Sequence, residues 1–325
     1  MNGKVTIIGC GHVGSSLAYS LLATQTANEI VLIDIDKEKA LGEAMDISQA
    51  LPFLSPATIY VGDYDDAKGS DIVIITSGLG RRPGQSRIDL ASTNVGIMKS
   101  IIPQITKYAA NAFYIIVANP VDVLTYQFIK TSGIPTHKII GSGTILDSAR
   151  LRTKISDLFS VRQDQIYAHV FGEHGDNSFI PWSMATINSI PIASYVKSLS
   201  TPYAKENEFS KEKVEEYVRT SGAEIIKRKG VTDYGIAASV TRICRCLFSR
   251  KETILTVSTL IDGEYGIKDV ALSIMSVVGC DGIKTNVAPP IEYDVQINDQ
   301  FLDNLSRDQV IEIQNVIDGF LQARV

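Results

Sequence analysis

The chain has 325 residues, of which 45% are hydrophobic and 21% charged, and its formal net charge is −5 at pH 7. This composition is ordinary for a globular protein with a sizeable core. The acidic balance gives no electrostatic reason to expect a nucleic acid or an anionic membrane as partner. No apolar run reaches the roughly 18 residues of a membrane span. The start, MNGKVTIIGCG, lacks the pattern of a secretory signal, so we expect a cytoplasmic protein.

Short apolar runs alternate with helical patterns over the first 145 residues. The runs are rich in Ile and Val, which is typical of parallel strands buried on both faces. They cover 4–9, 29–34, 57–62, 71–76, 113–118 and 137–141. Helical patterns at 13–25 and 88–110 lie between them. This alternation predicts a doubly wound α/β sheet with a parallel core over residues 1–145.

The pattern changes beyond about residue 150, which predicts a second, mixed α/β domain over residues 146–325. We expect a helix at 145–158, a strand at 165–172, a charged helix near 205–229 and two antiparallel strands within 252–279. A last helix should begin at Ser306, which has capping-box spacing to Gln309. No low-complexity linker separates the halves, so we expect them to pack closely.

The hexapeptide GCGHVG follows the first predicted strand and opens the first predicted helix. Gly9, Gly11 and Gly14 form a G-x-G-x-x-G pattern, and Asp34 ends the next strand twenty residues later. In this context the glycines allow a tight turn and close approach of the backbone to a pyrophosphate at a helix N-terminus. The Asp34 carboxylate would accept hydrogen bonds from the adenosine ribose and, with Asp36, repel a 2′-phosphate. The motif predicts NAD rather than NADP as cofactor.

The cysteines do not indicate a metal. Cys10, Cys244, Cys246 and Cys280 have no zinc-site spacing, and the sequence CRC has neither a second pair nor a flanking histidine. We expect reduced, buried thiols and no metal site.

One of the four histidines stands out. His174 lies in GEHGD, between two glycines and just past a predicted strand, where loops present functional groups. Its ordinary pKa suits proton transfer near neutral pH. We expect His12 to pack in the glycine loop, and His137 and His169 to be structural histidines with satisfied hydrogen bonds.

The segment LDSAR places Asp147 and Arg150 three residues apart at the start of a helix, so both can face one side. One interpretation is an ordinary ion pair on a helix surface. The other is functional: Asp147 orients a histidine, and Arg150 grips a planar carboxylate through two parallel hydrogen bonds.

The segment SGLGRRPGQSR, at 77–87, carries three arginines between glycines and a proline. Such a stretch favours a loop. Arg81, Arg82 and Arg87 are either solvated charges or groups that reach a substrate when the loop closes.

Together these stretches resemble the NAD-dependent L-lactate/malate dehydrogenase family over nearly the whole chain. The resemblance rests on GCGHVG with Asp34, RPGQSR, VANPVDVLTY, IGSGTILDSARLR, GEHGD and GVTDYGIA. It implies a Rossmann NAD-binding domain, a mixed α/β catalytic domain, a small 2-oxo or 2-hydroxy acid as substrate, and a homotetramer or homodimer.

The resemblance also implies roles for single residues. His174 matches the proton donor and acceptor, Asp147 its orienting partner, and Arg150 the clamp on the substrate carboxylate. Arg87 matches the loop arginine that polarises the carbonyl. Asn119 matches the contact to the nicotinamide ribose and substrate, and Thr232 a residue that lines the pocket. Further cofactor positions are Val13, Lys39, Tyr64, Gly78 and Ser142.

Two positions depart from the lactate pattern. Arg81 stands where the substrate side chain is read; lactate enzymes usually carry glutamine there and malate enzymes arginine. Arg152 matches an arginine of the fructose 1,6-bisphosphate site in activated bacterial enzymes, but Tyr167 replaces the expected histidine. That activation is therefore in doubt.

The leading hypothesis is NADH-dependent reduction of a short 2-oxo acid to the L-2-hydroxy acid, of the pyruvate/L-lactate type. The alternatives are oxaloacetate/L-malate chemistry because of Arg81, a dehydrogenase for bulkier 2-oxo acids, and an NAD-binding regulatory protein that has lost the chemistry.

Overall fold

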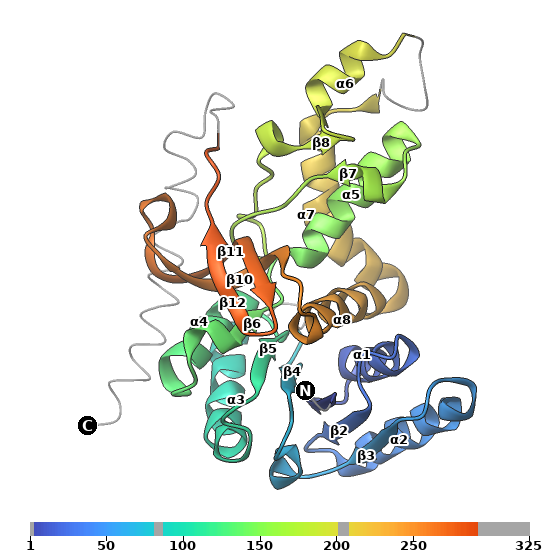
Figure 1. Ribbon diagram of the computed structural model, residues 1–325, viewed down its shortest axis with the longest axis vertical. Coiled ribbons are helices and arrows are strands. Elements are labelled where there is room, and N and C mark those ends of the chain that lie inside the picture. The colour runs from blue at the N-terminus through green and yellow to red at the C-terminus, as the bar shows by residue number, and fades with distance from the viewer. Residues whose placement is uncertain (1–2, 81–86, 201–207, 292–325) are drawn as a thin grey trace.

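The computed structural model describes residues 3–80, 87–200 and 208–291 (Figure 1). Arg81 and Arg82 lie outside these ranges, as does the helix expected from Ser306. The side chain of Arg87 is also outside the described part, although its backbone begins a helix.

Six parallel strands form the first half of the sheet, as the sequence predicts. They are β1 (Lys4–Ile8), β2 (Glu29–Ile33), β3 (Thr58–Val61), β4 (Ile72–Ile75), β5 (Phe113–Ile116) and β6 (Ile139–Gly141). Their spatial order is β3-β2-β1-β4-β5-β6, and each neighbouring pair is parallel. The order reverses between β1 and β4. In such sheets ligands bind beyond the carboxyl ends of the strands at this reversal.

The strand β3 corrects one expectation. The sequence favours burial on both faces, but no residue of β3 is fully buried. The strand lies at the edge of the sheet, with β2 as its one neighbour in the described part. An Ile/Val-rich run identifies a strand without saying whether it is central.

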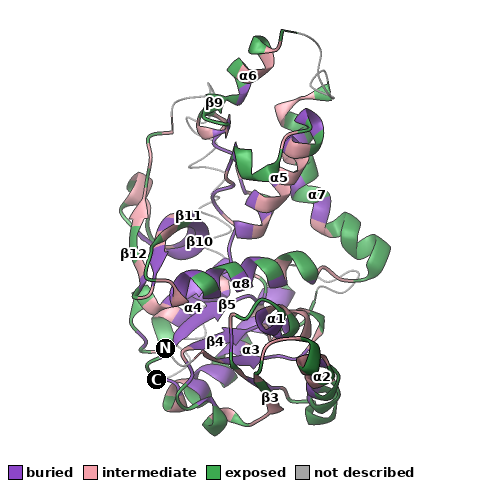
Figure 2. Cartoon of the chain, turned by 45° about the vertical axis from the view of Figure 1, so that its right-hand side comes forward, coloured by how far each residue is buried: buried purple, intermediate pink, exposed green. Residues whose placement is uncertain are grey.

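Alternate residues of the central strands face opposite helical layers. Ile7, Ile72 and Ile74 belong to a core with α1, α2 and α8, whereas Ile8 and Val73 belong to a core with α3 and α4. The helices are α1 (His12–Ala23), α2 (Lys37–Ala50), α3 (Arg87–Tyr108), α4 (Val121–Thr131) and α8 (Tyr234–Phe248). Figure 2 shows buried strands between these layers. This is the doubly wound arrangement of the prediction.

The sheet continues into the second half of the chain. Strand β10 (Thr253–Asp262) is antiparallel to both β6 and β11 (Lys268–Gly279), and β12 (Gly282–Val287) follows β11. One residue pair, Ser258 with Gly141, joins β10 to β6, so nine strands form one sheet. The two antiparallel strands and the turn at Gly263, where φ is 125°, agree with the sequence.

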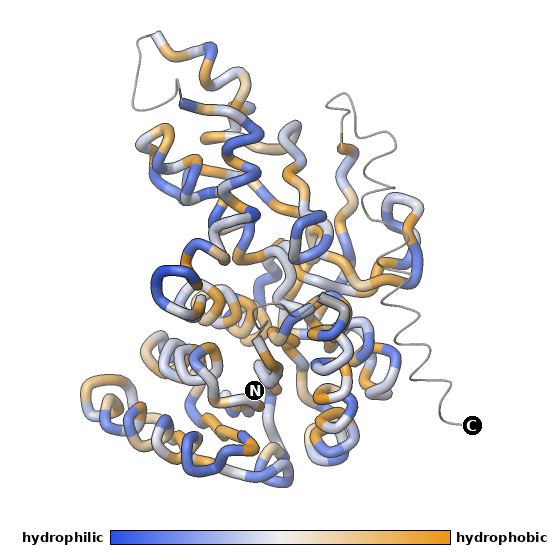
Figure 3. The backbone as a smooth tube through the Cα atoms, turned by 180° about the vertical axis from the view of Figure 1, so that it is seen from behind, coloured by the Kyte–Doolittle hydropathy of each residue, from blue (hydrophilic) through white to orange (hydrophobic). Residues whose placement is uncertain are grey.

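A separate core lies beyond this sheet. It contains α5 (Ile145–Phe159), α6 (Ile192–Ser198), α7 (Lys211–Lys229) and a small sheet of β7 (Ile166–Tyr167), β8 (Thr186–Ile187) and β9 (Ile190–Pro191). Figure 3 shows hydrophobic segments through the middle of the molecule and hydrophilic ones on the outer helices.

The prediction of a strand at 165–172 is mostly wrong. Only two of its residues form β7, and the rest of the segment pairs through isolated bridges of Phe171 with Phe179 and of Gly172 with Ser273. The second bridge ties the segment to β11 of the large sheet. The chain therefore crosses from one core to the other just before His174.

Candidate functional site

The glycine loop is tightly packed on one side and open on the other. Gly9 has φ of +105°, and a Cβ there would lie 2.7 Å from the Ser77 amide nitrogen. A Cβ on Gly14 would lie 1.9 Å from the Gly9 carbonyl oxygen. Apart from its own chain neighbours, no described residue has an atom within 4 Å of a Cβ built on Gly11. The first and third glycines are required by packing, and the second leaves room for a ligand against the backbone.

The N-terminus of α1 has free backbone amides. Its N-cap residue, Gly11, makes no side-chain cap, and the first turn has no acidic residue. By contrast, α2 is capped by Asp36, whose side chain accepts from the Lys39 amide at 3.0 Å. Uncapped amides and the helix dipole favour an anionic group. The loop and α1 therefore fit the diphosphate of a dinucleotide.

Asp34 is held in place at the end of β2. Its Oδ2 accepts from the Cys10 amide at 2.5 Å, and its Oδ1 accepts from the Asp36 amide at 2.9 Å. The neighbouring Ile35 is fully exposed, and sequence reasoning missed it. Its exposure could not be read from the sequence, because Ile35 follows directly on a buried strand.

The remaining cofactor candidates differ in burial. Val13 and Tyr64 are half-buried, Lys39 is exposed, and Ser142 is buried. A Cβ on Gly78 would lie 3.2 Å from the Ala118 side chain, so this glycine is at least partly required by packing.

Asn94 joins two loops of the site and was not predicted. Its side chain accepts from the Leu79 amide at 2.8 Å and donates to the Asn119 carbonyl at 2.6 Å. Only 1% of Asn94 is exposed. Asn119 itself is exposed just after β5. Ser92 and Thr93 directly precede Asn94 in α3, so the sequence offered no sign that this polar residue is the buried one that needs partners.

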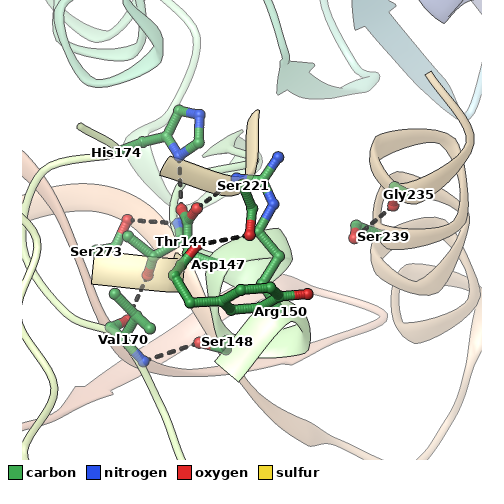
Figure 4. Close-up of polar contacts among 11 residues, drawn as sticks. Thr144, Asp147, Ser148, Arg150, Val170, His174, Ser221, Gly235, Ser239 and Ser273 are labelled. Carbon is green, nitrogen blue, oxygen red and sulfur yellow. Dashed lines mark hydrogen bonds and ion pairs between the residues drawn. The ribbon is translucent and has the colours of Figure 1, made fainter. Parts of the chain in front are cut away.

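His174, Asp147 and Arg150 form one hydrogen-bonded row (Figure 4). The Nδ1 of His174 lies 2.6 Å from Asp147 Oδ2, and Arg150 Nη1 donates to Asp147 Oδ1 at 2.8 Å. Because a carboxylate only accepts, Nδ1 carries the hydrogen of the first bond. The other ring nitrogen points away from Asp147. Side-chain exposure is 26% for His174, 14% for Arg150 and 8% for Asp147.

The structure agrees in part with both interpretations of LDSAR, the ion pair and the functional pair. Asp147 and Arg150 do form an ion pair, but it is largely buried, and the same carboxylate contacts His174. A Cβ on Gly222 of α7 would lie 3.4 Å from Arg150 Nη2, so this glycine leaves space for the guanidinium.

Charge and burial act in opposite directions on this row. Burial lowers the pKa of His174, but the charge and hydrogen bond of Asp147, with a smaller contribution from Asp122, raise it above its ordinary value. Burial raises the pKa of Asp147, but His174 and then Arg150 hold it below its ordinary value. The imidazolium is stabilised near neutral pH, and its carboxylate partner stays ionised.

Buried hydroxyls hold the histidine segment against α5. Thr144, at the N-cap of α5, donates to the Val170 carbonyl, and Ser148 accepts from the Val170 amide at 2.9 Å. Ser273 of β11 accepts from the Thr144 amide at 3.1 Å. These bonds place the segment before His174 and the first turn of α5 side by side (Figure 4).

Asp122, on α4, is a further contact of His174 that sequence reasoning missed. Its Oδ2 accepts from the His174 backbone amide at 2.8 Å. Only 7% of the residue is exposed. Asp122 is the second residue of α4, where an acidic side chain is ordinary, so the sequence offered no distinctive signal.

Other candidates are not brought into this row. Thr232 is half-buried in the segment between α7 and α8. Arg87 begins α3, but its side chain lies outside the described part, as does Arg81. Among the described residues no group of three or more His, Cys, Asp or Glu could hold a metal ion.

The remaining histidines and one cysteine differ from the predicted packing and burial. His12 and His137 are exposed rather than packed. His169 has a buried Nδ1 without a partner in the described part, and burial, with the charge of Arg152, lowers its pKa to about 4. All four cysteines are free, as expected, but Cys280 is only half-buried.

Comparison with known proteins agrees with this geometry. Residues 3–141 match the family model of the lactate/malate dehydrogenase NAD binding domain, and residues 144–309 match that of the lactate/malate dehydrogenase alpha/beta C-terminal domain. The L-lactate dehydrogenase of Acetivibrio thermocellus is 44% identical over 281 residues, 86% of this chain and 88% of the relative. L-lactate dehydrogenase 1 of Clostridium acetobutylicum is 40% identical over 305 residues, 94% and 95% of the two chains.

Solved structures are similar along almost the whole chain. MGS-M5, a lactate dehydrogenase enzyme from a deep-sea metagenome library of the Medee basin, has a TM-score of 0.89 at 35% identity and covers 98% of this chain and 99% of its own. The minor L-lactate dehydrogenase from Enterococcus mundtii has a TM-score of 0.87 at 33% identity, with coverages of 97% and 98%. The chain therefore belongs to the lactate/malate dehydrogenase family and is an NAD-dependent 2-hydroxyacid dehydrogenase.

Proposed function

We propose that this enzyme reduces pyruvate to L-lactate with NADH. The observation that carries the proposal is the buried row of His174, Asp147 and Arg150, which places a proton donor beside a cation that can bind a carboxylate. The similarity to several L-lactate dehydrogenases supports pyruvate as the substrate.

His174 supplies the proton. Reduction of a 2-oxo acid develops negative charge on the carbonyl oxygen, and the protonated imidazole donates to that oxygen from the nitrogen that faces away from Asp147. Asp147 fixes the tautomer through Nδ1 and stabilises the positive ring. In the reverse direction the neutral ring accepts the same proton.

Arg150 binds the substrate carboxylate. One of its guanidinium nitrogens is held by Asp147, which fixes the plane of the fork, and Gly222 leaves space beside the other. Two parallel hydrogen bonds from a guanidinium match a carboxylate. We propose that Arg87 polarises the carbonyl, that Asn119 contacts substrate and nicotinamide ribose, and that Thr232 lines the pocket.

The glycine loop and the N-terminus of α1 would hold the cofactor, which would supply the hydride. We propose that the free amides of α1 bind the diphosphate, that Asp34 accepts from the ribose hydroxyls, and that Ile35 covers the base. The other proposed contacts come from Gly9, Gly11, Val13, Gly14, Lys39, Tyr64, Gly78 and Ser142.

Arg81 favours a second candidate function, malate dehydrogenase. An arginine enclosed with the substrate needs a counter-ion, because a charge removed from water is costly without a partner. Oxaloacetate has a second carboxylate to supply it, whereas pyruvate offers a methyl group.

A comparison of kcat/KM for pyruvate, oxaloacetate and a branched or aromatic 2-oxo acid tests the proposal. We expect pyruvate to be preferred. A preference for oxaloacetate would assign malate chemistry, and a preference for the bulky acid a widened pocket. Absence of NADH oxidation with every acid would contradict the proposal and favour a regulatory NAD-binding protein.

We also propose a homo-oligomer, a tetramer or a dimer, in the cytoplasm. Large apolar side chains are exposed on α2 (Leu41 and Met45) and on α7 (Ile225 and Ile226), which supports an interface between copies. Light scattering coupled to gel filtration measures the oligomeric state.

No helix of the described part is long and apolar enough to cross a membrane. We keep the proposed boundary between domains 1–145 and 146–325, although the sheet runs across it.

A further inference from the structure

A second carboxylate lies behind the proposed proton donor. Asp122 is on the first turn of α4, and its Oδ2 accepts from the His174 backbone amide at 2.8 Å. It is 7% exposed and has no cationic partner among the described residues. A buried carboxylate without a counter-ion is costly, so its presence at this place suggests a functional reason.

The other oxygen of Asp122 faces a small polar cluster. Asp122 Oδ1, Thr125 Oγ1 and Ser258 Oγ are all buried without a hydrogen bond of normal geometry in the described part. A Cβ on Gly141 would lie 2.3 Å from Thr125 Oγ1 and 2.7 Å from Ser258 Cβ, so the glycine gives these groups their space. This cluster is where β6, β10 and α4 meet.

We propose that Asp122 is a positioning residue for His174: it holds the backbone of the histidine and, as a second negative charge beside Asp147, favours the protonated ring. The inference rests on the proposed function, in which His174 moves the proton. It adds a residue from α4 to a row that otherwise comes from α5 and the histidine loop.

Electrostatics agree with this geometry. Burial raises the pKa of Asp122 to about 6, although Ser258 and the His174 amide act to lower it. The charge of Asp122 in turn raises the pKa of His174, after the larger effect of Asp147. The two groups are therefore coupled.

Other charged groups also act on the pair of Asp122 and His174. Asp147 and Arg150 face His174 from α5, with opposite effects on its pKa, and Glu173 raises the pKa of Asp122 from the histidine loop. Each of them stays unchanged in the variants below.

Asp122→Asn separates charge from position. The amide oxygen can still accept from the His174 amide, and the amide nitrogen can donate to the Ser258 or Thr125 hydroxyl. Asp122→Leu removes the acceptor as well. Asp71→Asn is the matched control, because Asp71 Oδ2 also accepts backbone amides, from Gly3 at 2.8 Å and Lys4 at 3.2 Å, far from His174.

The first measurement is the pH profile of kcat/KM for pyruvate reduction. In Asp122→Asn we expect the alkaline midpoint to fall by roughly half a pH unit or more, which is about a threefold loss at pH 8. Below pH 6 the two profiles should converge, since Asp122 of the parent, with a pKa of about 6, is then protonated. Asp122→Leu should lower kcat about tenfold or more at every pH while NADH affinity is kept.

The second measurement does not need activity. With histidine labelled by ¹³C, NMR titration gives the pKa of His174 directly, and His174→Asn assigns its signal among the four histidines. This value should fall in Asp122→Asn and stay constant in Asp71→Asn. If the parent oxidises no NADH with any 2-oxo acid, the proposed function fails, but this titration still decides the inference.

Thermal unfolding tests whether the role of Asp122 is purely structural. A folded-state pKa raised above the ordinary value of an aspartate means that ionised Asp122 destabilises the fold as pH rises through about 6. Asp122→Asn should therefore raise the Tm at pH 8, with the gain vanishing toward pH 4. A lower Tm at both pH values, or an unchanged His174 pKa and pH profile, would overturn the proposal.

Discussion

The cofactor end and the substrate end of the site use different kinds of chemical group. At the cofactor end the functional groups are mainly backbone: three glycines and the free amides of α1 within residues 9–14. At the substrate end they are side chains from separate elements, Asp122 on α4, Asp147 on α5 and His174 on a loop. The first arrangement is sensitive to the size of a residue and the second to its charge.

The largest effect should come from the charge-sensitive end. His174→Asn should reduce kcat by about 10²- to 10⁴-fold, because the substitution removes the proposed proton donor. NADH affinity, measured by fluorescence titration, should hardly change, since the cofactor is bound elsewhere. Asp147→Asn should lower kcat less, by disturbing the tautomer of the ring. A wild-type rate in His174→Asn would mean that another residue carries the proton.

The size-sensitive end offers a matched pair of variants. Gly14→Ala places a Cβ 1.9 Å from the Gly9 carbonyl oxygen, and should lower the free energy of unfolding by about 1–3 kcal/mol or more. Gly11→Ala meets no atom within 4 Å and should change stability by less than about 1 kcal/mol while weakening NADH binding. Denaturant unfolding and NADH titration measure both. Equal stability losses in the two variants would break the comparison.

Our proposal assigns Arg81 to the charge-sensitive end. Arg81→Gln should raise the ratio of kcat/KM for pyruvate over oxaloacetate by roughly tenfold or more if the side chain is enclosed with the substrate. The same two assays on the parent provide the reference. An unchanged ratio would mean that Arg81 points into solvent and that the loop carries one functional arginine, Arg87.

Asp34 is the place where charge matters at the cofactor end. The parent should prefer NADH over NADPH, because the carboxylate repels a 2′-phosphate. Asp34→Ser should narrow the gap in kcat/KM by about tenfold. Because Asp34 also accepts a hydrogen bond from the Cys10 amide, the Tm of the Asp34→Ser variant has to be measured in parallel. Equal use of both cofactors by the parent would refute the assignment.

The smallest effect is expected for fructose 1,6-bisphosphate. Tyr167 is 58% exposed and offers no positive charge to a phosphate, and Arg152 is not exposed. Adding the compound at neutral pH should leave the pyruvate KM nearly unchanged. A severalfold drop in KM would show that an anion site works here without the histidine.

The sequence by itself determined the parallel half of the fold and the members of the site that lie in local motifs. Short Ile/Val runs and the glycine motif act over neighbouring residues, so the six strands, α1 and the position of Asp34 could be read directly. The edge position of β3 could not, because it depends on which strands pair. The strand expected at 165–172 failed for a similar reason: beyond β7 the segment makes only isolated bridges, from Phe171 to the nearby Phe179 and from Gly172 to Ser273 in a distant part of the chain.

Tertiary structure alone decided how the charged groups meet. The sequence suggested His174, Asp147 and Arg150 one by one, but left open whether the last two were a surface pair; burial and the common carboxylate come from the packing of α5 against the histidine segment. Asn94 and Asp122 were not found at all, since each is one of several polar residues in its helix and only the folded chain shows that it is buried. Their partners, Leu79 and Asn119 for one and His174 for the other, come from other loops. Local patterns specify backbone conformation, whereas the pKa of a side chain depends on charges that only the folded chain brings near.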